Sequence, residues 1–389
     1  MRRAGVKQVG VKQVGVKRVV LKVGSSSLTD ADGRIDLAKL SEIAAAVRSA
    51  KAAGIEIALV SSGAVAAGAG KLGRARPRTL PEKQAFAAVG QAELMRQWAG
   101  VFAPPDVAPI VVAQFLLSSD DIHSRKRFVN AKQALDAAFK LGVLPILNEN
   151  DTVATAELKL GDNDTLSAWV AYLVDADTLM LLTDVDGLYS ANPKTDANAV
   201  KLSEVRDISQ VMHLAGDAGS ARGTGGMRTK LKAAQIASDA GIDTIILTGG
   251  GAAVQASLSG ATIGTRIFAP RPRTAARPDF AQTRRQTAKR SWILHQPTRG
   301  AISIDAGAKT ALLAGRSLLP SGITQIEGDF NSGDAVQIRF GDQLLGQGLS
   351  SYRAADLQRI AGKRSAEISA ILGVKPFDEA IHRDRLVLG

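Results

Sequence analysis

Two short segments of the sequence combine a lysine with small residues in a pattern suited to binding phosphate. In the first, Lys22 precedes Gly24 and three serines at 25–27. Glycine lets backbone N–H groups approach a phosphate without a Cβ in the way, and the lysine supplies a point charge. A tight turn beside a solvated lysine would have the same composition. This segment alone therefore indicates an anion site without establishing one.

The second segment is a glycine cluster at residues 223–227, Gly-Thr-Gly-Gly-Met, which is followed by Arg228, Thr229 and Lys230. The residues from 227 on have a helical pattern, and the N-terminus of a helix favours anions such as phosphate. A flexible loop before an ordinary helix start is the alternative. Neither segment has the Gly-Lys-Ser/Thr ending of a Walker A motif, and no dinucleotide fingerprint is present.

Acids and amides gather in two further segments, Asn-Glu-Asn-Asp at 148–151 and Gly-Asp-Asn-Asp at 161–164. Beside lysine- and glycine-bearing loops, such residues suit phosphoryl transfer, in which lysines, donors and Mg²⁺ neutralise the charge on the phosphoryl oxygens. The second segment could also be a simple helix N-cap, and Asp184 could be a cap or turn residue. The chain has no cysteine and four histidines, none in a predicted strand-end loop. A carboxylate acceptor needs no histidine base because it is already an anionic nucleophile.

The elements that must position these residues alternate between short apolar runs and alanine-rich helical stretches. The predicted strands are residues 18–23, 55–60, 107–112, 142–147, 178–182 and 244–247. The predicted helices are residues 37–54, 81–99, 126–141, 163–174 and 227–240. This alternation predicts repeated β-α units around a mostly parallel sheet.

Ligands bind beyond the carboxyl ends of the strands in open parallel sheets, and those ends are polar here. The second predicted strand is followed by Ser-Ser-Gly at 61–63, the fifth by Thr183 and Asp184, and the sixth by Thr-Gly-Gly-Gly at 248–251. The coincidence of position and chemistry predicts an active site at this edge of the sheet.

The positive charge is concentrated at two places outside this pattern. The chain of 389 residues, 45% of them hydrophobic, has a net charge of +12, and residues 1–22 and 270–300 carry +7 each. The remainder is therefore near neutral. We expect a disordered extension at 1–17, a domain of β-α units at 18–269, a basic linker at 270–296, a small β-rich domain at 297–375 and a tail at 376–389. The apolar runs are too short to cross a membrane, and no secretory signal is present, so the default location is cytoplasmic.

The motifs at 148–151, 154–157, 161–164 and 223–230, taken in order, resemble the glutamate 5-kinase branch of the amino-acid kinase superfamily. The resemblance implies a three-layer α/β/α sandwich and ATP-dependent phosphorylation of the side-chain carboxylate of L-glutamate, the first step of proline biosynthesis. It also implies that Lys22 and Lys230 stabilise the transferring phosphoryl group and that Asp164 orients them. Mg²⁺ would arrive with the nucleotide, with no direct protein ligand.

The resemblance also implies the residues that bind each substrate. Glutamate would be held by Ser62, Asp151 and Asn163. The positions similar to those that bind ATP are Lys22, Gly24, Thr183, Asp184, Thr224, Gly225, Gly226, Met227, Arg228, Thr229 and Lys230. Three features depart from the family pattern: the N-terminal repeat, Ser25-Ser26 in place of a threonine-serine pair, and Arg228 in place of serine.

The segment from about 300 to 373 resembles a PUA domain, a small β-barrel module found in RNA-modifying enzymes. The likeness lies in residues 304–309, 319–323 and 333–336. RNA binding through this domain and the basic linker is therefore an alternative principal function, since clustered cations release counterions from a polyanion. A kinase acting on aspartate, N-acetylglutamate or a carbamate is another. By resemblance we further expect a homo-oligomer, dimer or tetramer, and inhibition by proline.

Overall fold

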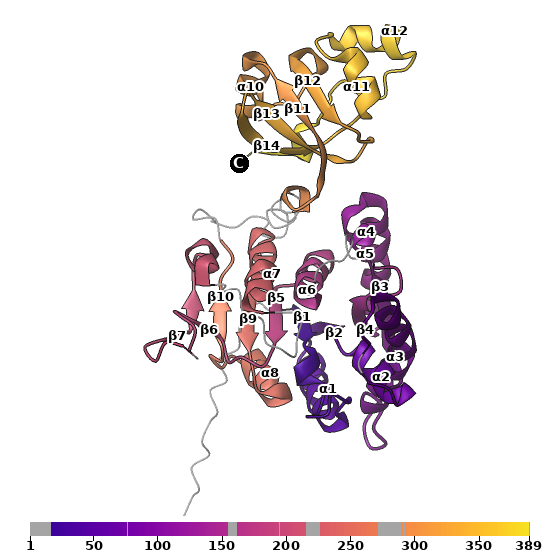
Figure 1. Cartoon of the computed structure of the whole chain (residues 1–389), viewed down its shortest axis with the longest axis vertical. Coiled ribbons are helices and arrows are strands. Elements are labelled where there is room, and N and C mark those ends of the chain that lie inside the picture. Colours follow the sequence, from indigo (N-terminus) through magenta and orange to yellow (C-terminus); the bar gives the residue numbers. More distant parts are fainter. Residues whose placement is uncertain are drawn as a thin grey trace, which may run out of the picture. The chain divides into compact units, whose positions relative to one another are not determined.

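The computed structural model describes residues 17–75, 77–154, 162–193, 195–214, 226–270, 290 and 292–388. The chain divides into two compact units, Met1–Thr274 and Ala275–Gly389 (Figure 1). Of the predicted extension at 1–17, only Lys17 is described, and its backbone N–H donates to Asp177 Oδ2 at 2.7 Å.

The first unit is built on an eight-stranded sheet in the order β3-β4-β2-β1-β5-β9-β10-β8. Its strands are β1 (Arg18–Val23), β2 (Glu56–Ser61), β3 (Val112–Leu117), β4 (Leu144–Glu149), β5 (Thr178–Leu182), β8 (Glu204–Val205), β9 (Asp243–Leu247) and β10 (Thr265–Ile267). All neighbours pair in parallel except β9 and β10. A separate hairpin joins β6 (Leu188–Tyr189) to β7 (Lys201–Leu202). The prediction of a mostly parallel sheet is confirmed.

Helices fill the connections between these strands. They are α1 (Leu37–Ala52), α2 (Ala64–Leu72), α3 (Leu80–Val101), α4 (Ser119–His123), α5 (Arg125–Lys140), α6 (Asn163–Leu173), α7 (Met227–Asp239) and α8 (Gly250–Leu258), with short 3₁₀ turns at Ser25–Ser27 and Ile208–Leu214. Helix α6 packs beside α7, and α1 beside α8 (Figure 1). The short helices α2 and α8 were not predicted; each follows a glycine with a positive φ, Gly63 and Gly249.

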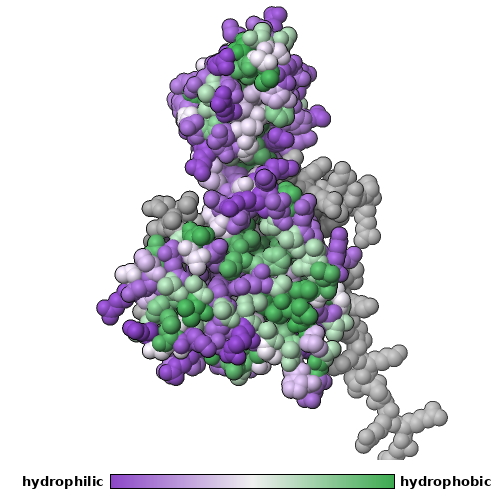
Figure 2. Space-filling model, turned by 90° about the vertical axis from the view of Figure 1, so that its right-hand side faces the viewer, coloured by the Kyte–Doolittle hydropathy of each residue, from purple (hydrophilic) through white to green (hydrophobic). Residues whose placement is uncertain are grey.

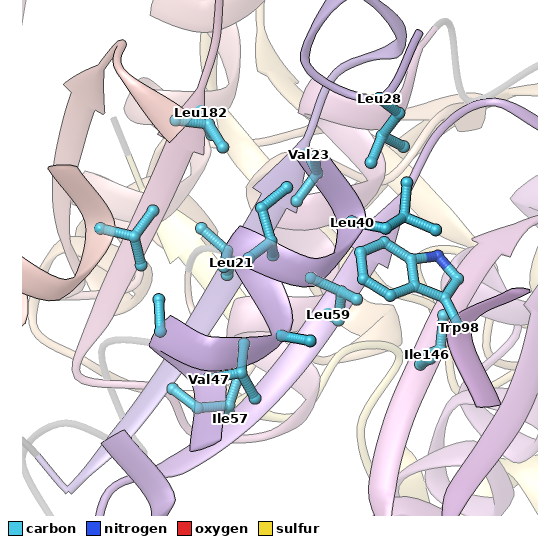
Figure 3. Packing of buried hydrophobic residues seen from close by; sticks show 14 of the residues in the cluster. Leu21, Val23, Leu28, Leu40, Val47, Ile57, Leu59, Trp98, Ile146 and Leu182 are labelled. Carbon is cyan, nitrogen blue, oxygen red and sulfur yellow. The ribbon is translucent and has the colours of Figure 1, made fainter. Parts of the chain in front are cut away.

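Alternate residues of the central strand β1 face opposite sides of the sheet. Val19, Leu21 and Val23 belong to an apolar cluster that includes residues of α1, α3 and α8 (Figure 3). Lys22 has the opposite parity and so faces the other side, where α6 packs against β1. Alternation along β1 thus places the apolar cluster on one face of the sheet and Lys22 on the other.

One predicted strand, residues 107–112, is wrong. The strand β3 begins only at Val112 and runs to Leu117. Pro109 lies within the predicted run, and proline has no N–H for a ladder hydrogen bond. Because β3 is an edge strand, its residues are mostly half-buried, and Gln114 interrupts its apolar residues.

The second unit contains a five-stranded sheet in the order β12-β11-β13-β14-β15. Its elements are β11 (Thr298–Ile304), α10 (Ala306–Leu313), β12 (Ile323–Gly328), β13 (Ala335–Phe340), β14 (Gln343–Leu349), α11 (Ala354–Ile360), α12 (Ile368–Leu372) and β15 (Leu386–Leu388), with 3₁₀ turns at Pro320–Gly322, Ser365–Glu367 and Arg383–Arg385. Neighbouring strands are antiparallel except β11 and β13. An apolar core of its own includes Ile302, Phe330 and Ile338.

Two boundaries predicted for this unit need correction. The supposed tail at 376–389 supplies β15, which pairs with β14, and Val387 is buried. Residues 271–289 of the predicted linker at 270–296 lie outside the described part of the chain. Trp292 and Ile293, near the end of that linker, are buried. Gln347 Nε2 on β14 donates to the Ile293 carbonyl at 2.8 Å, so these residues belong to the C-terminal unit. Short apolar segments without a clear period gave no sign of these contacts in the sequence.

Apolar side chains also reach the surface of the first unit, in patches between hydrophilic residues (Figure 2). Val107, Val111 and Leu141 are among the exposed examples. No helix in the described part of the chain is long and apolar enough to cross a membrane.

Candidate active site

Lys22 lies at the carboxyl end of β1, at the point where the order of strands reverses. From β1 the chain adds β2 on one side, whereas β5 pairs on the other. Such a reversal opens a crevice beyond the strand ends, where ligands bind in open α/β sheets. Lys22 is nevertheless only 7% exposed. A buried ammonium needs a partner, and the structure provides one.

Asp164 joins Lys22 to Lys230 although the three residues come from three different elements. Lys22 Nζ lies 2.6 Å from Asp164 Oδ1, and Lys230 Nζ lies 3.5 Å from Asp164 Oδ2. Asp164 is in the first turn of α6 and Lys230 in the first turn of α7, and these helices pack together. The prediction that the two lysines share one site with Asp164 between them therefore has a geometric basis. We call these three residues the charged cluster.

The charged cluster keeps the Asp164 carboxylate ionised in spite of its burial. Burial acts to raise the pKa of Asp164, but the charges of Lys22 and Lys230 and the hydrogen bonds from Lys22 and Thr229 outweigh it. The net result is a pKa below the ordinary value for aspartate. The cluster thus holds two cations for one anion, an excess of one positive charge suited to an anionic ligand.

The neighbouring Asp162 has the opposite shift. Burial raises its pKa above the ordinary value, and the charge of Asp164 adds to this effect. The backbone N–H of Thr165, which donates to Asp162 Oδ1 at 2.8 Å, acts against the rise without cancelling it. Asp162 is the N-cap of α6. The N-cap role that the sequence left open for this motif thus belongs to Asp162, while Asp164 faces the lysines.

The start of α7 brings Thr229 into the same group. Its hydroxyl donates to Asp164 Oδ2 at 2.7 Å and also lies 2.8 Å from the carbonyl oxygen of Gly226, the N-cap residue. Met227 is half-buried and Arg228 is exposed. The predicted ATP-binding residues Thr224 and Gly225, like residues 155–161, lie outside the described residues.

The segment after β1 passes close to the Lys22 ammonium. Gly24 N donates to the carbonyl of Leu182 at 3.3 Å, and a Cβ added at Gly24 would lie 3.4 Å from Lys22 Nζ. This is an ordinary van der Waals distance, so the ammonium does not by itself require a glycine at this position. Lys39 of α1, which sequence reasoning missed, donates to the carbonyl of Thr29 at 2.6 Å. It thereby ties the end of this segment to α1.

A neutral cluster lies beside the charged one. Asn163 Nδ2 donates to Ser62 Oγ at 2.8 Å and to Asn148 Oδ1 at 2.9 Å. Ser62 follows β2 and Asn148 lies near the end of β4. Two predicted glutamate-binding residues, Ser62 and Asn163, are therefore in direct contact. Asn148 belongs to a segment that the sequence singled out, but its contact with Asn163 was not predicted.

The remaining predicted residues lie at the same carboxyl edge of the sheet. Asp151 is in the turn after β4, where its carbonyl accepts from the Ala154 N–H at 3.3 Å. Thr183 follows β5; its N–H donates to the carbonyl of Leu247 at 2.9 Å and its hydroxyl to Asp184 Oδ1 at 3.0 Å. The bond from Thr183 to Leu247 links the ends of the neighbouring strands β5 and β9.

His123 lies nearer to the end of a strand than the predicted strands placed it. Because β3 begins five residues later than predicted, the helix that follows it, α4, ends at His123. Its ring packs edge-on against Trp169 at a centroid distance of 6.0 Å, and its Nδ1 lies 2.7 Å from the carbonyl oxygen of Ser119. His123 thus belongs to a short helix after β3 and not to a strand-end loop, and its Nδ1 is engaged within that helix.

Comparison with known proteins agrees with this geometry. The model of the amino acid kinase family matches residues 17–248, which include every residue of both clusters. The chain belongs to the amino acid kinase family. The model of the PUA domain matches residues 300–372, in the C-terminal unit. Both resemblances found in the sequence are thus confirmed.

Among curated relatives of this amino acid kinase are three bacterial proteins named glutamate 5-kinase. That of Carboxydothermus hydrogenoformans is 44% identical over 375 residues, which cover 95% of this chain and 96% of the relative. That of Xanthomonas euvesicatoria is 46% identical over 379 residues, covering 95% and 100%. That of Deinococcus radiodurans is 45% identical over 374 residues, covering 95% and 99%. The similarity therefore extends through both units.

Proposed function

We propose that this chain transfers the γ-phosphoryl group of ATP to the side-chain carboxylate of L-glutamate, forming L-glutamate 5-phosphate, the first step of proline biosynthesis. The observation that supports this most is the charged cluster of Lys22, Asp164 and Lys230 at the carboxyl edge of the sheet. The near full-length similarity to proteins named glutamate 5-kinase selects this acceptor among the carboxylates.

The reaction forms a bond between a glutamate carboxylate oxygen and the γ-phosphorus. The bond from that phosphorus to the oxygen bridging to the β-phosphate breaks, and its electron pair leaves with ADP. Charge spreads over the equatorial oxygens during transfer, so fixed cations lower the barrier. Lys22 and Lys230 would contact those oxygens from two sides, and Asp164 would keep both ammonium groups aimed. No proton needs to be removed from the acceptor.

The neutral cluster would position the acceptor. Ser62 and Asn163 offer a hydroxyl and an amide beside the charged cluster, and these groups bind a carboxylate without neutralising it. The Asp151 carboxylate complements the α-ammonium group of an amino acid. A negative charge at Asp151 would thus favour an amino acid over a simple carboxylic acid.

ATP would occupy the edge formed by Gly24, Thr183, Asp184 and the segment from Thr224 to Lys230. Magnesium would arrive with the nucleotide, bound to its phosphates, without a direct protein ligand. When bound, the ion would supply further charge neutralisation on the phosphates.

Hydroxylamine trapping tests the proposal. The enzyme, MgATP and hydroxylamine are incubated with L-glutamate, L-aspartate, N-acetyl-L-glutamate or carbamate, and the hydroxamate and ADP are both measured. For carbamate, whose phosphate gives no comparable hydroxamate, ADP release decides. We expect hydroxamate and equal ADP with L-glutamate. Turnover only with another acceptor would change the substrate, and ATP-independent binding of RNA without turnover would favour the RNA-binding alternative.

Further parts of the proposal concern partners and location. We include inhibition by proline, association into dimers or tetramers, and a cytoplasmic location; RNA binding through the PUA domain is a second activity to be tested. Initial rates with added proline test the inhibition, and sedimentation equilibrium tests the association. A salt-dependent gel shift with labelled RNA tests RNA binding.

A further inference from the structure

A buried tryptophan on α3 is linked to the segment that carries Ser62. Trp98 has no exposed surface and lies in the apolar cluster beneath the sheet, with Leu40 and Leu59 (Figure 3). A buried indole N–H needs an acceptor. Trp98 Nε1 donates to the hydroxyl of Ser61 at 3.0 Å, and Ser61 is also fully buried. This bond reaches from the core to the end of β2.

The Ser61 hydroxyl passes the link on to the next residue. Its Oγ donates to the carbonyl oxygen of Ser62 at 3.0 Å. The N–H of Ser62 donates to the carbonyl of Val23 at 3.1 Å. Both backbone groups of Ser62 are thus held from inside the domain, which leaves its side chain to face the site.

The following glycine allows the chain to turn away at this point. Gly63 has a φ of +102°, in the region that side chains rarely adopt, and is the N-cap of α2. Ser62 is therefore fixed between a strand and a sharp turn. Its hydroxyl meets Asn163 Nδ2 at 2.8 Å.

We propose that Trp98 and Ser61 are positioning residues that set the affinity for the carboxylate acceptor through the backbone of Ser62. This inference rests on the proposed function, in which Ser62 binds L-glutamate. An apolar side chain at position 98 would fill the same core, but the Ser61 hydroxyl would lose its buried donor. The hydroxyl could then turn and release the Ser62 carbonyl, and the geometry of the acceptor site would loosen.

Trp98→Phe removes the indole N–H and keeps an aromatic ring. We expect the KM for L-glutamate to rise by about three- to tenfold, the loss typical of one hydrogen bond, with little change in kcat or in the KM for ATP. Ser61→Ala, which barely alters the core volume, should give a similar rise. In the double variant the two effects should not add, because both break the same link.

Phe102→Leu is the matched control. Phe102 is fully buried in the same core and stacks on Trp98 at a centroid distance of 5.8 Å, without a bond to Ser61. We expect it to lower the midpoint of urea unfolding as Trp98→Phe does, with no change in the KM for L-glutamate. An equal rise in KM in Phe102→Leu would mean that Trp98 acts only through packing.

The Ser62→Ala variant separates this inference from the proposed function. If Ser62→Ala leaves the KM for L-glutamate unchanged, the assignment of the acceptor site is wrong. If Ser62→Ala raises it while Ser61→Ala and Trp98→Phe both leave it unchanged, the acceptor site stands and the positioning role is overturned.

Discussion

The two halves of the site differ in charge although they share the first turn of one helix. Asp164 bridges two buried lysines, whereas the amide of its neighbour Asn163 donates to uncharged oxygens of Ser61, Ser62 and Asn148. Successive residues of a helix point in different directions, so the start of α6 can serve both halves. Two adjacent residues of one helical turn thus face a region rich in charge and a region with neutral donors.

This difference has a chemical reason in a phosphoryl transfer to a carboxylate. The migrating group gains from cations on several sides. The attacking carboxylate must keep its negative charge, and a close ion pair with lysine would lower its nucleophilicity. Neutral donors fix its position at a smaller cost in nucleophilicity. We therefore expect the charged half to control kcat and the neutral half to control acceptor binding.

Removing a lysine should break the charged half with the largest effect on rate. We expect Lys230→Ala to lower kcat by about 10²- to 10³-fold, the loss found when one donor to a transition-state charge is removed, with a much smaller change in the KM for L-glutamate. Steady-state ADP release measures both constants. Lys232→Ala, two residues further along α7 and exposed, is the control and should behave as the wild type. A large KM effect at constant kcat would contradict the role of Lys230.

Neutralising Asp164 tests whether the same half is held together by its anion. Asp164→Asn leaves two buried ammonium groups without a counterion, and breaking such a pair costs about 3 kcal/mol or more of unfolding free energy. Urea unfolding at pH 7 measures this loss. The exposed Asp106→Asn is the control.

The pH dependence of that loss has a definite sign. Because the pKa of Asp164 is lowered in the folded state, its contribution to stability is fully present above the ordinary aspartate pKa and disappears as pH falls through the lowered value. The difference between wild type and Asp164→Asn should therefore be equal at pH 7 and pH 5.5. A difference that vanished by pH 5.5 would mean that Asp164 is not held ionised by the lysines.

The neutral half should respond in the KM for the acceptor. Asn163→Ala removes the amide that contacts Ser62 and Asn148, and we expect the KM for L-glutamate to rise about tenfold, as for loss of one or two hydrogen bonds. The KM for ATP, measured at saturating glutamate, serves as the internal control and should be unchanged. Equal changes in both KM values would contradict the division of the site.

A smaller effect should arise at Asp162, between the cap and the charged half. Asp162→Asn keeps a side-chain oxygen for the N-cap and removes a carboxylate whose pKa is raised by burial and by Asp164. The ionised form is disfavoured in the folded state, so we expect a gain of roughly 0.5 kcal/mol at pH 7. Urea unfolding should show this gain shrinking as pH falls, because Asp162 then becomes protonated in both the folded and the unfolded protein. A loss of stability at pH 7 would show that the cap requires the charge.

The sequence predicted best those elements whose burial is continuous. Strands β1 and β5 have the predicted ends, because neighbours on both edges keep them almost continuously buried and most of their residues are apolar. The edge strand β3 was misplaced because it is only half-buried and Gln114 interrupts its apolar residues. Strand β15 was taken as a tail because three residues gain their burial only from a distant partner, β14.

The same distinction holds within the site. Lys22, Asp164 and Lys230 could be chosen because they lie in polar, glycine-bearing segments suited to phosphate and because the resemblance to the amino-acid kinase superfamily implied their roles. The hydrogen bonds from Asn163 to Asn148 and from Trp98 to Ser61 could not be predicted. An asparagine or a tryptophan in a helix does not reveal from the sequence which residue its side chain will contact. Only the packing of α3 and α6 brings these groups within 3.0 Å of their partners.

The most direct test is a crystal structure of the protein with ADP, Mg²⁺, aluminium fluoride and L-glutamate. Aluminium fluoride takes the place of the phosphoryl group in transfer. We expect the ammonium groups of Lys22 and Lys230 both to contact the fluoride, and the glutamate side-chain carboxylate to lie between it and the Ser62–Asn163 contact. Fluoride bound away from either lysine, or glutamate bound at another edge of the sheet, would contradict it.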